Sequence, residues 1–274
     1  MQDGIILWEA HRAGAGGNEM PESCHAAFEY GWTVGGRPEA DVNMTADGVM
    51  VSVHDNTLDR IVPDLPEKWK GKTIGELTWD QVRSCNVGWG EFPRQRVASI
   101  EELLAILQQH PERHMVIDYK RVERPLLADM IKRYGVNSQI TFASSQRELC
   151  REMHSLVPGI RTKNWLGGSA EAIMEKFAVV KQENFAGITE VQLHLNDVPE
   201  RAPGAWRYAL PPEFVREALQ ICKDNGILLQ TLPWFFEKAD MDALLDLGVR
   251  SFAVDFPGKF LRLTSAYFTA HYLD

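Results

Sequence analysis

Residues 38–55 read PEADVNMTADGVMVSVHD, two alternating segments joined by the dipeptide Asp47-Gly48. This dipeptide supplies the positive φ angles of a two-residue hairpin turn, so the stretch predicts two antiparallel strands. With that loop, Asp41 stands opposite His54, and Glu39 lies on the same face as both. The other face is predicted to be apolar and to comprise Ala40, Val42, Met44, Val51 and Val53. A hairpin whose polar face only meets solvent is the alternative.

Strand-like and helix-like segments alternate about eight times along the chain. Short apolar runs predict strands at residues 5–9, 114–120, 139–143, 159–162, 187–194, 227–232 and 251–255, in addition to the hairpin. Amphipathic segments between them predict helices, for example over residues 125–134, 146–156, 169–183 and 240–247. This alternation predicts a parallel α/β fold, and the length of 274 residues favours a closed (β/α)8 TIM barrel.

Residues 56–98 interrupt the alternation with a polar, turn-rich segment. We expect them to form a small insertion near the active-site face of a single barrel domain that spans residues 1–274. The insertion carries Trp69, Trp89 and Phe92. These aromatic side chains would either contact part of a substrate and set its specificity, or only hold the insertion against the barrel.

The net charge of −9 argues against nucleic acid or an anionic membrane as the main partner. No apolar run approaches the length of a membrane span, and the first residues lack the pattern of a signal peptide. We therefore expect no stable membrane insertion and a cytoplasmic location. The cysteines lack CxxC spacing and are expected to be free and buried; they are Cys24, Cys85, Cys150 and Cys222. The oligomeric state stays open.

Polar side chains gather where the predicted strands end. In (β/α)8 barrels the working residues lie at the carboxyl ends of the strands. The residues at or near such ends are His11, Arg12, Glu39, Asp41, Asp118, Lys120, His194 and Asp255. The first of them are followed by a glycine-rich loop at residues 13–20. Because these polar groups come from separate strands and meet at one rim, a functional site is favoured over a solvated hairpin.

Three of these residues are carboxylates, Glu39, Asp41 and Asp118. Hard oxygen ligands of this kind suit one Mg²⁺ or Ca²⁺ ion, although salt bridges to Arg12 and Lys120 would also explain them. Arg12 and Lys120 are the donors that a phosphate group needs, the first as a bidentate fork and the second as a point charge. The set therefore indicates a metal site beside a phosphate site.

Two histidines, His11 and His54, stand beside this expected metal site. A histidine suits proton transfer near neutral pH. Together with a metal ion and two cations, the pair indicates in-line displacement at phosphorus, in which one histidine is the base and the other the acid. We favour His54 as the acid, although the sequence does not settle the order.

Several motifs resemble those of the glycerophosphodiester phosphodiesterases. The most specific are HRAGAGGNEMPES at residues 11–23 and PEADVNMTADGVMVSVHDNTLDR at residues 38–60. The likeness continues through TIGELT, VASIEELL, VIDYK and GVRSFAVDFP, and so covers nearly the whole chain. The resemblance implies a TIM barrel that hydrolyses a small-molecule glycerophosphodiester to an alcohol and glycerol phosphate, a reaction of lipid metabolism. By position, it implies a catalytic pair (His11, His54), metal ligands (Glu39, Asp41, Asp118) and phosphate contacts (Arg12, Lys120).

The chain departs from the family's pattern at five places, one of which is a longer loop before Pro21. Ala13 replaces a glycine, and Ser23 replaces an asparagine. Asp118 stands where a glutamate is more usual, so a metal ion would have to shift or accept a water molecule. Residues 230–233, QTLP, replace a tryptophan-containing phrase, which puts the usual alcohol specificity in doubt.

Three other functions remain as alternatives. A lyase-like relative would cleave lysophospholipid or sphingolipid head groups and leave a cyclic phosphate. A glycosidase would use Glu39 or Asp41 together with Asp118, but it would need no metal and would give the histidines no role. A non-catalytic barrel would keep the fold as a binding protein.

Overall fold

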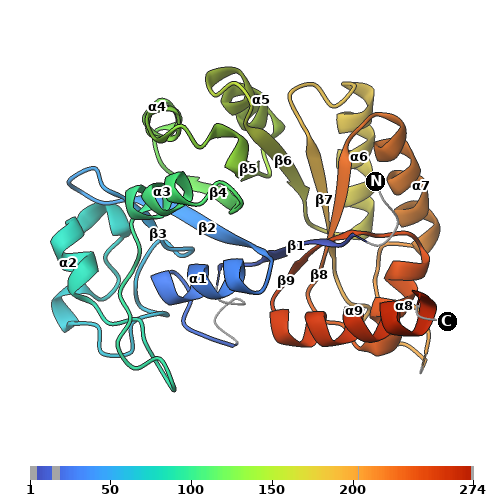
Figure 1. Ribbon diagram of the computed structural model, residues 1–274, viewed down its shortest axis with the longest axis horizontal. Helices are drawn as coiled ribbons and strands as arrows, with labels where there is room; N and C mark the ends of the chain where they lie inside the picture. The colour runs from blue at the N-terminus through green and yellow to red at the C-terminus, as the bar shows by residue number, and fades with distance from the viewer. Residues whose placement is uncertain (1–4, 14–18, 203, 273–274) are drawn as a thin grey trace.

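The structure, a computed structural model, describes residues 5–13, 19–202 and 204–272 (Figure 1). Within these residues, eight parallel strands form one barrel, which closes because β1 pairs with both β2 and β9. In order around the barrel the strands are β1 (Leu7–Ala10), β2 (Arg37–Met44), β4 (Met115–Arg121), β5 (Ile140–Ser144), β6 (Arg161–Leu166), β7 (Glu190–Leu195), β8 (Leu228–Pro233) and β9 (Ser251–Val254). The predicted (β/α)8 TIM barrel is confirmed.

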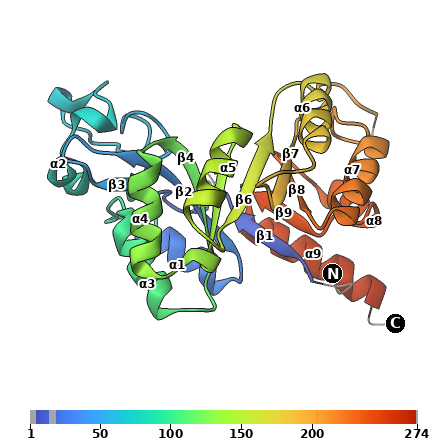
Figure 2. The ribbon, with the colours of Figure 1, turned by 90° about the horizontal axis from the view of Figure 1, so that it is seen from above.

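Each barrel strand leads to a helix on the outside of the barrel (Figures 1 and 2). In chain order these helices are α1 (His25–Thr33), α3 (Ile100–Gln109), α4 (Arg124–Tyr134), α5 (Arg147–Leu156), α6 (Ala170–Gln182), α7 (Pro212–Asp224), α8 (Lys238–Asp246) and α9 (Pro257–Tyr272). Their apolar stripes face the sheet, as the fully buried Leu103 and Leu107 of α3 illustrate. Helix α9 was not predicted from the sequence; its Phe260 is also buried.

The hairpin is present, with one correction to its loop. β3 (Met50–Ser52) pairs antiparallel with β2, and Val42 lies opposite Ser52 rather than opposite Val53 as the sequence predicted. The loop contains the three residues 46–48, not two, and Gly48 takes its positive φ of 82°. The additional loop residue shifts the register of the pair by one.

The prediction that Asp41 stands opposite His54 is therefore wrong. His54 lies beyond the end of β3, and the Asp41 carbonyl accepts a backbone hydrogen bond from Val53 (2.8 Å). Both faces of β3 are covered, since Val51 and Ser52 are each buried. Alternation along such a strand marks no solvent face, so it could not fix the register.

Residues 56–98 connect the hairpin to α3 and lie at one side of the barrel, around α2 in Figures 1 and 2. They contain two 3₁₀ turns (Glu67–Trp69 and Ile74–Glu76) and helix α2 (Trp79–Ser84). Ile74 and Leu77 are almost fully buried, and the Leu77 carbonyl accepts a hydrogen bond from Ala46 in the hairpin loop (2.8 Å). The segment therefore packs on the hairpin.

The interior of the barrel is polar rather than filled with branched aliphatic side chains. Near the amino ends of the strands, Arg37 forms an ion pair with Glu190 (3.0 Å). In the next layer toward the carboxyl ends of the strands, Lys163 forms an ion pair with Glu9 and donates a hydrogen bond to Gln230 (3.2 Å). These groups are buried, so each depends on its partner for compensation of its charge or polarity. They form the floor beneath the carboxyl ends of the strands.

Two further features bear on the expectations from sequence. The four cysteines are free and buried, as expected. Among the described residues, no helix combines the length and the apolar character needed to cross a membrane.

Candidate active site

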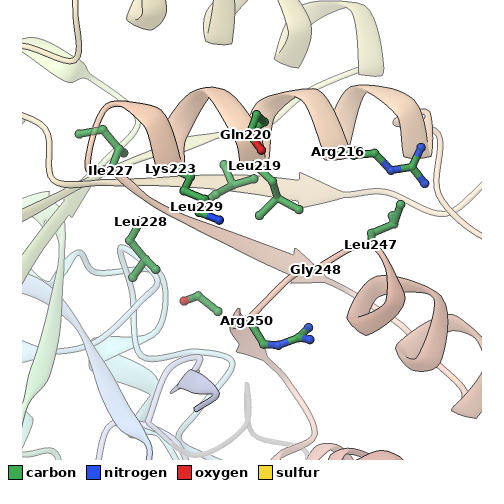
Figure 3. A pocket seen from close by; sticks show the side chains of 11 residues that line it. Arg216, Leu219, Gln220, Lys223, Ile227, Leu228, Leu229, Leu247, Gly248 and Arg250 are labelled. Atoms are coloured by element: carbon green, nitrogen blue, oxygen red, sulfur yellow. The ribbon is translucent and has the colours of Figure 1, made fainter. Parts of the chain in front are cut away.

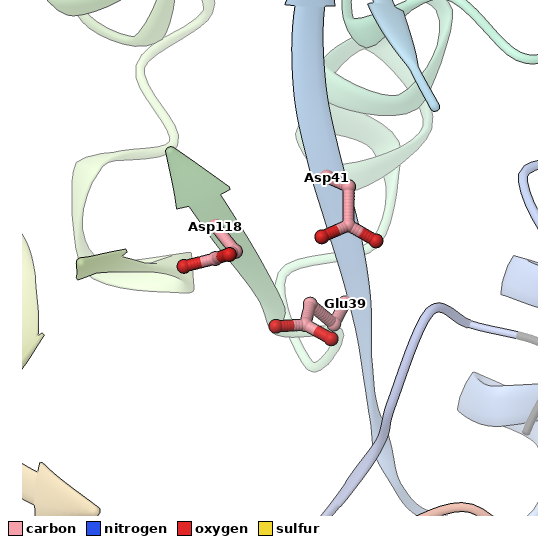
Figure 4. A group of neighbouring side chains, drawn as sticks. All are labelled: Glu39, Asp41 and Asp118. Carbon is pink, nitrogen blue, oxygen red and sulfur yellow. The ribbon is translucent and has the colours of Figure 1, made fainter. Parts of the chain in front are cut away.

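Three carboxylates from two neighbouring strands, β2 and β4, converge (Figure 4). Glu39 and Asp41 lie two residues apart on β2 and so share its inner face, and Asp118 of β4 is the direct pairing partner of Asp41. One oxygen from each residue lies within 4.8 Å of the others, and all three residues are buried. The strand register thus assembles the predicted acidic cluster.

The cluster suits a divalent cation. Burial raises the pKa of Glu39 and of Asp41, and the neighbouring carboxylates raise both further, because three negative charges in one buried place repel one another. Asp41 Oδ1 is buried and accepts no well-directed hydrogen bond, although Lys120 Nζ lies 3.0 Å away. Carboxylate oxygens are the donors that Mg²⁺ and Ca²⁺ prefer.

His11 follows β1 and sits between two carboxylates. Its Nδ1 lies 2.5 Å from Asp255 Oδ1, and its Nε2 lies 3.7 Å from Glu39 Oε2. Burial by itself would lower the pKa of His11, but Glu39, Asp255 and Asp41 together raise it to about 9. The strained backbone of Arg12, at φ 52°, lets its N–H donate to Glu39 Oε2 (3.0 Å).

His54 lies just past β3, between the carboxylate of Asp55 and the guanidinium of Arg12. Its Nε2 lies 3.1 Å from Arg12 Nη2, and its Nδ1 lies 2.7 Å from Asp55 Oδ1. Since a guanidinium only donates, Nε2 is the acceptor and Nδ1 carries the proton. Burial lowers the pKa of His54, as do Lys120 and Arg12, while Asp55 opposes them. Arg60 in turn holds Asp55 (2.6 Å).

Lys120 completes the set on β4. Its Nζ lies 2.5 Å from Asp118 Oδ2 and 3.0 Å from Asp41 Oδ1. Burial would lower the pKa of Lys120, but these two carboxylates and Glu39 raise it, so the amine is charged. With Lys120 in place, the structure brings together the residues to which the sequence assigned a role, namely His11, Arg12, Glu39, Asp41, His54, Asp118 and Lys120. The predicted glycine-rich loop falls largely on residues 14–18, which lie outside the described residues.

Six of these groups, all but Asp41, line a hollow of about 130 Å³, and most of its far wall was not predicted. That wall comprises Trp165, Gln192, His194, Leu232 and Trp234, from the ends of β6, β7 and β8. Of these, His194 stood out in the sequence by its place at a strand end, and Leu232 lies in the phrase 230–233 that departs from the family's pattern. An aromatic residue at a strand end belongs to no motif, so position alone could have indicated Trp165. The hollow has no lining residue from 56–98 among the described residues, so the three insertion aromatics do not reach it.

A separate cavity of about 270 Å³ lies between α7 and the strands β8 and β9 (Figure 3). Arg216, Lys223 and Arg250 line it together with apolar side chains, and its described lining has no carboxylate. It shares no lining residue with the hollow around the acidic cluster. Among the described residues, neither histidine and no carboxylate of the acidic cluster lines this second cavity.

Comparison with known proteins gives consistent results. A family model described as "Glycerophosphoryl diester phosphodiesterase family" matches residues 11–259. A glycerophosphodiester phosphodiesterase of Caldanaerobacter subterraneus subsp. tengcongensis is 22% identical over 269 residues, 93% of this chain and 96% of that protein. One from Bacillus subtilis is 24% identical over 280 residues, 96% of this chain and 87% of that protein.

Solved structures share the fold. A glycerophosphodiester phosphodiesterase from Agrobacterium tumefaciens superposes with a TM-score of 0.70 at 18% identity, over 94% of this chain and all (100%) of that one. An Oleispira antarctica phosphodiesterase, solved with the product sn-glycerol-3-phosphate, gives 0.69 at 16% identity, over 95% of this chain and 97% of that one. Because the family model matches residues 11–259 of 274 and includes every predicted site residue, the chain belongs to the glycerophosphoryl diester phosphodiesterase family.

Proposed function

We propose that this chain is a metal-dependent phosphodiesterase that hydrolyses glycerophosphodiesters to an alcohol and glycerol phosphate. The observation that carries the proposal is one hollow, lined by two histidines, an arginine and a lysine, at a cluster of three buried carboxylates. Family membership and the names of the full-length relatives support the same reaction. The product in the Oleispira antarctica structure is glycerol phosphate, which agrees with the proposed products.

In this proposal Arg12 and Lys120 bind the phosphodiester. Both line the hollow, and both can donate several hydrogen bonds to non-bridging oxygens. The Arg12 side chain reaches from the β1 end toward His54, and Lys120 reaches from β4 toward Asp41, so a phosphate between them meets positive charge from two sides. Glu39, Asp41 and Asp118 would hold the cation, Mg²⁺ or Ca²⁺, which would supply further positive charge to the developing phosphoryl oxygens.

We assign the base role to His54 and the acid role to His11, the reverse of the order favoured from sequence. His54 Nε2 is the unprotonated ring nitrogen, because it accepts from Arg12, and Asp55 accepts a hydrogen bond from the protonated Nδ1. His54 takes a proton from the attacking water as its oxygen bonds to phosphorus. The bond from phosphorus to the alcohol oxygen breaks, and His11, oriented by Asp255, gives its Nε2 proton to that oxygen.

We also propose a single catalytic barrel in a reducing, cytoplasmic setting. The strand order places β1 and β9 side by side, so both ends of the barrel domain belong to one closed sheet. Four buried free thiols suit a compartment where thiols stay reduced.

The test is a release assay on glycerophosphocholine, glycerophosphoethanolamine and glycerophosphoinositol. The protein is first stripped with a chelator and then supplied with Mg²⁺ or Ca²⁺. We expect the added metal ion to restore release of the alcohol and of glycerol phosphate. ³¹P NMR identifies the phosphorus-containing product. A cyclic phosphate product would indicate the lyase-like alternative, and full activity in chelator would contradict the metal site.

A matched experiment tests the two histidine roles. His11→Ala and His54→Ala should each lower kcat/KM by about 10²-fold or more. A nitrophenyl phosphodiester, whose leaving group needs no protonation, should restore turnover to His11→Ala but not to His54→Ala. Rescue of the opposite variant would return the acid role to His54.

A further inference from the structure

We infer that Trp165 is a positioning residue that aims the carboxylate of Asp118 at the cation site. The inference rests on the proposed function only in taking the acidic cluster as a cation site. Trp165 lies near the end of β6, and its Nε1–H donates to Asp118 Oδ1 (3.0 Å). The other oxygen of Asp118 accepts from Lys120 (2.5 Å). Both carboxylate oxygens thus have a fixed donor.

A hydrogen-bond donor in a fixed position restricts the orientation of an aspartate carboxylate. The last torsion of an aspartate side chain is broad, so a free carboxylate samples many orientations. The indole N–H has a single direction set by its ring. A hydrogen bond from it to Oδ1 therefore selects one orientation of Asp118, the one in which an oxygen lies within 4.8 Å of Glu39 and Asp41. A ligand oriented in advance costs less to order when a cation binds.

The ring of Trp165 is itself held in place. It stacks on the ring of His194, with centroids 5.1 Å apart and planes 9° apart. His194 Nε2 bonds to Gln192 Oε1 (3.1 Å), and Gln192 donates to Gln230 (2.6 Å) in the buried floor of the barrel. Gly167 makes room for the stack, because a Cβ there would lie 2.9 Å from the His194 ring. The donor to Asp118 is therefore anchored to the barrel core.

Two roles of Trp165 can be separated by substitution. Its ring lines the hollow, and its N–H holds Asp118. Trp165→Phe keeps an aromatic wall and removes the N–H. Trp32 offers a matched control, because its Nε1 also donates a hydrogen bond, to the His114 carbonyl (2.8 Å), at a site that does not line the hollow. Trp32→Phe loses a bond of the same kind without touching the cluster.

The experiment is calorimetric titration of Mg²⁺, and separately of Ca²⁺, into metal-stripped wild-type protein, Trp165→Phe and Trp32→Phe. Metal-free melting temperatures are recorded in parallel. We expect Trp165→Phe to bind the cation about tenfold more weakly, the low end of what loss of a supporting hydrogen bond costs a metal site. Trp32→Phe should bind it as tightly as wild type.

Other results overturn the inference. Equal cation affinity of Trp165→Phe and wild type would mean that the indole N–H does not position Asp118. Equal weakening in Trp32→Phe would reflect general loss of stability. If Trp165→Phe melts too early to titrate, Trp165→Tyr is measured in its place, and failure of both to fold would make Trp165 a structural residue only. Wild-type protein that binds neither cation would refute the cation site of the proposed function, whereas tight binding by all variants would refute only the role of Trp165.

Discussion

His54 lies between two opposing influences, the carboxylate of Asp55 at Nδ1 and the guanidinium of Arg12 at Nε2. Its pKa falls below the ordinary value of 6.5, because burial, Lys120 and Arg12 outweigh the opposing effect of Asp55. If His54 is the base, it must be neutral, so kcat/KM falls as the pH drops through this lowered pKa. The acid limb of the profile should then lie below pH 6.5.

The Asp55→Asn variant tests whether His54 is the base. Asp55 raises the pKa of His54, so its removal should lower that pKa further and move the acid limb toward lower pH. The measurement is the pH profile of kcat/KM for both proteins, with the His54 ring followed by NMR. If activity instead falls as the pH rises through the His54 pKa, His54 is the acid.

Among the described residues, the elements that wall the hollow are barrel strands and not the insertion at residues 56–98. The sequence left open whether the aromatic residues of 56–98 set the alcohol specificity or only hold the insertion against the barrel, and the hollow is walled by residues of β6 to β8 and Trp234. Trp234 lies against both His11 and His194, with ring centroids 5.6 Å and 5.4 Å apart. Trp89 is 39% exposed and does not line the hollow.

We therefore expect Trp234→Ala to change the relative kcat/KM among choline, ethanolamine and inositol head groups by several-fold, since loss of a ring removes apolar contact worth roughly 1–3 kcal/mol. Trp89→Ala should leave these ratios unchanged. Both variants are assayed on the same panel at saturating metal. A shift with Trp89→Ala and none with Trp234→Ala would return specificity to the insertion.

The whole barrel depends on buried ion pairs where many barrels use aliphatic layers. Lys163 and Glu9 are each about 1% exposed, and burial raises the pKa of Glu9 despite the nearby ammonium. Lys163→Met would leave Glu9 without its counter-charge, which should cost about 3–5 kcal/mol of unfolding free energy. Urea unfolding at neutral pH measures the loss. The double variant Glu9→Gln/Lys163→Met should recover most of it; no recovery would mean that Lys163 stabilises the barrel by packing rather than by charge.

The sequence predicted the architecture and the membership of the acidic cluster because both follow from local patterns. Strand–helix alternation brings the carboxyl ends of parallel strands to one rim, so Glu39, Asp41 and Asp118 had to meet there. The hairpin register did not follow, because Asp-Gly serves two- and three-residue loops and both faces of β3 are covered. The contact of Trp165 with Asp118 joins β6 to β4 across the barrel with β5 between them, and no local pattern encodes it.

The central claim is that Glu39, Asp41 and Asp118 form the cation site on which phosphodiester hydrolysis depends. Asp41→Asn tests it most directly, because it removes one ligand charge from a buried cluster while keeping the shape of the side chain. The measurement is kcat/KM for glycerophosphocholine against added Mg²⁺ or Ca²⁺ after chelation, with metal-free melting curves. We predict that wild-type activity vanishes in chelator and returns with metal, while Asp41→Asn folds normally and stays inactive. Chelated wild-type protein at full activity, or Asp41→Asn with near-normal turnover, would contradict the claim.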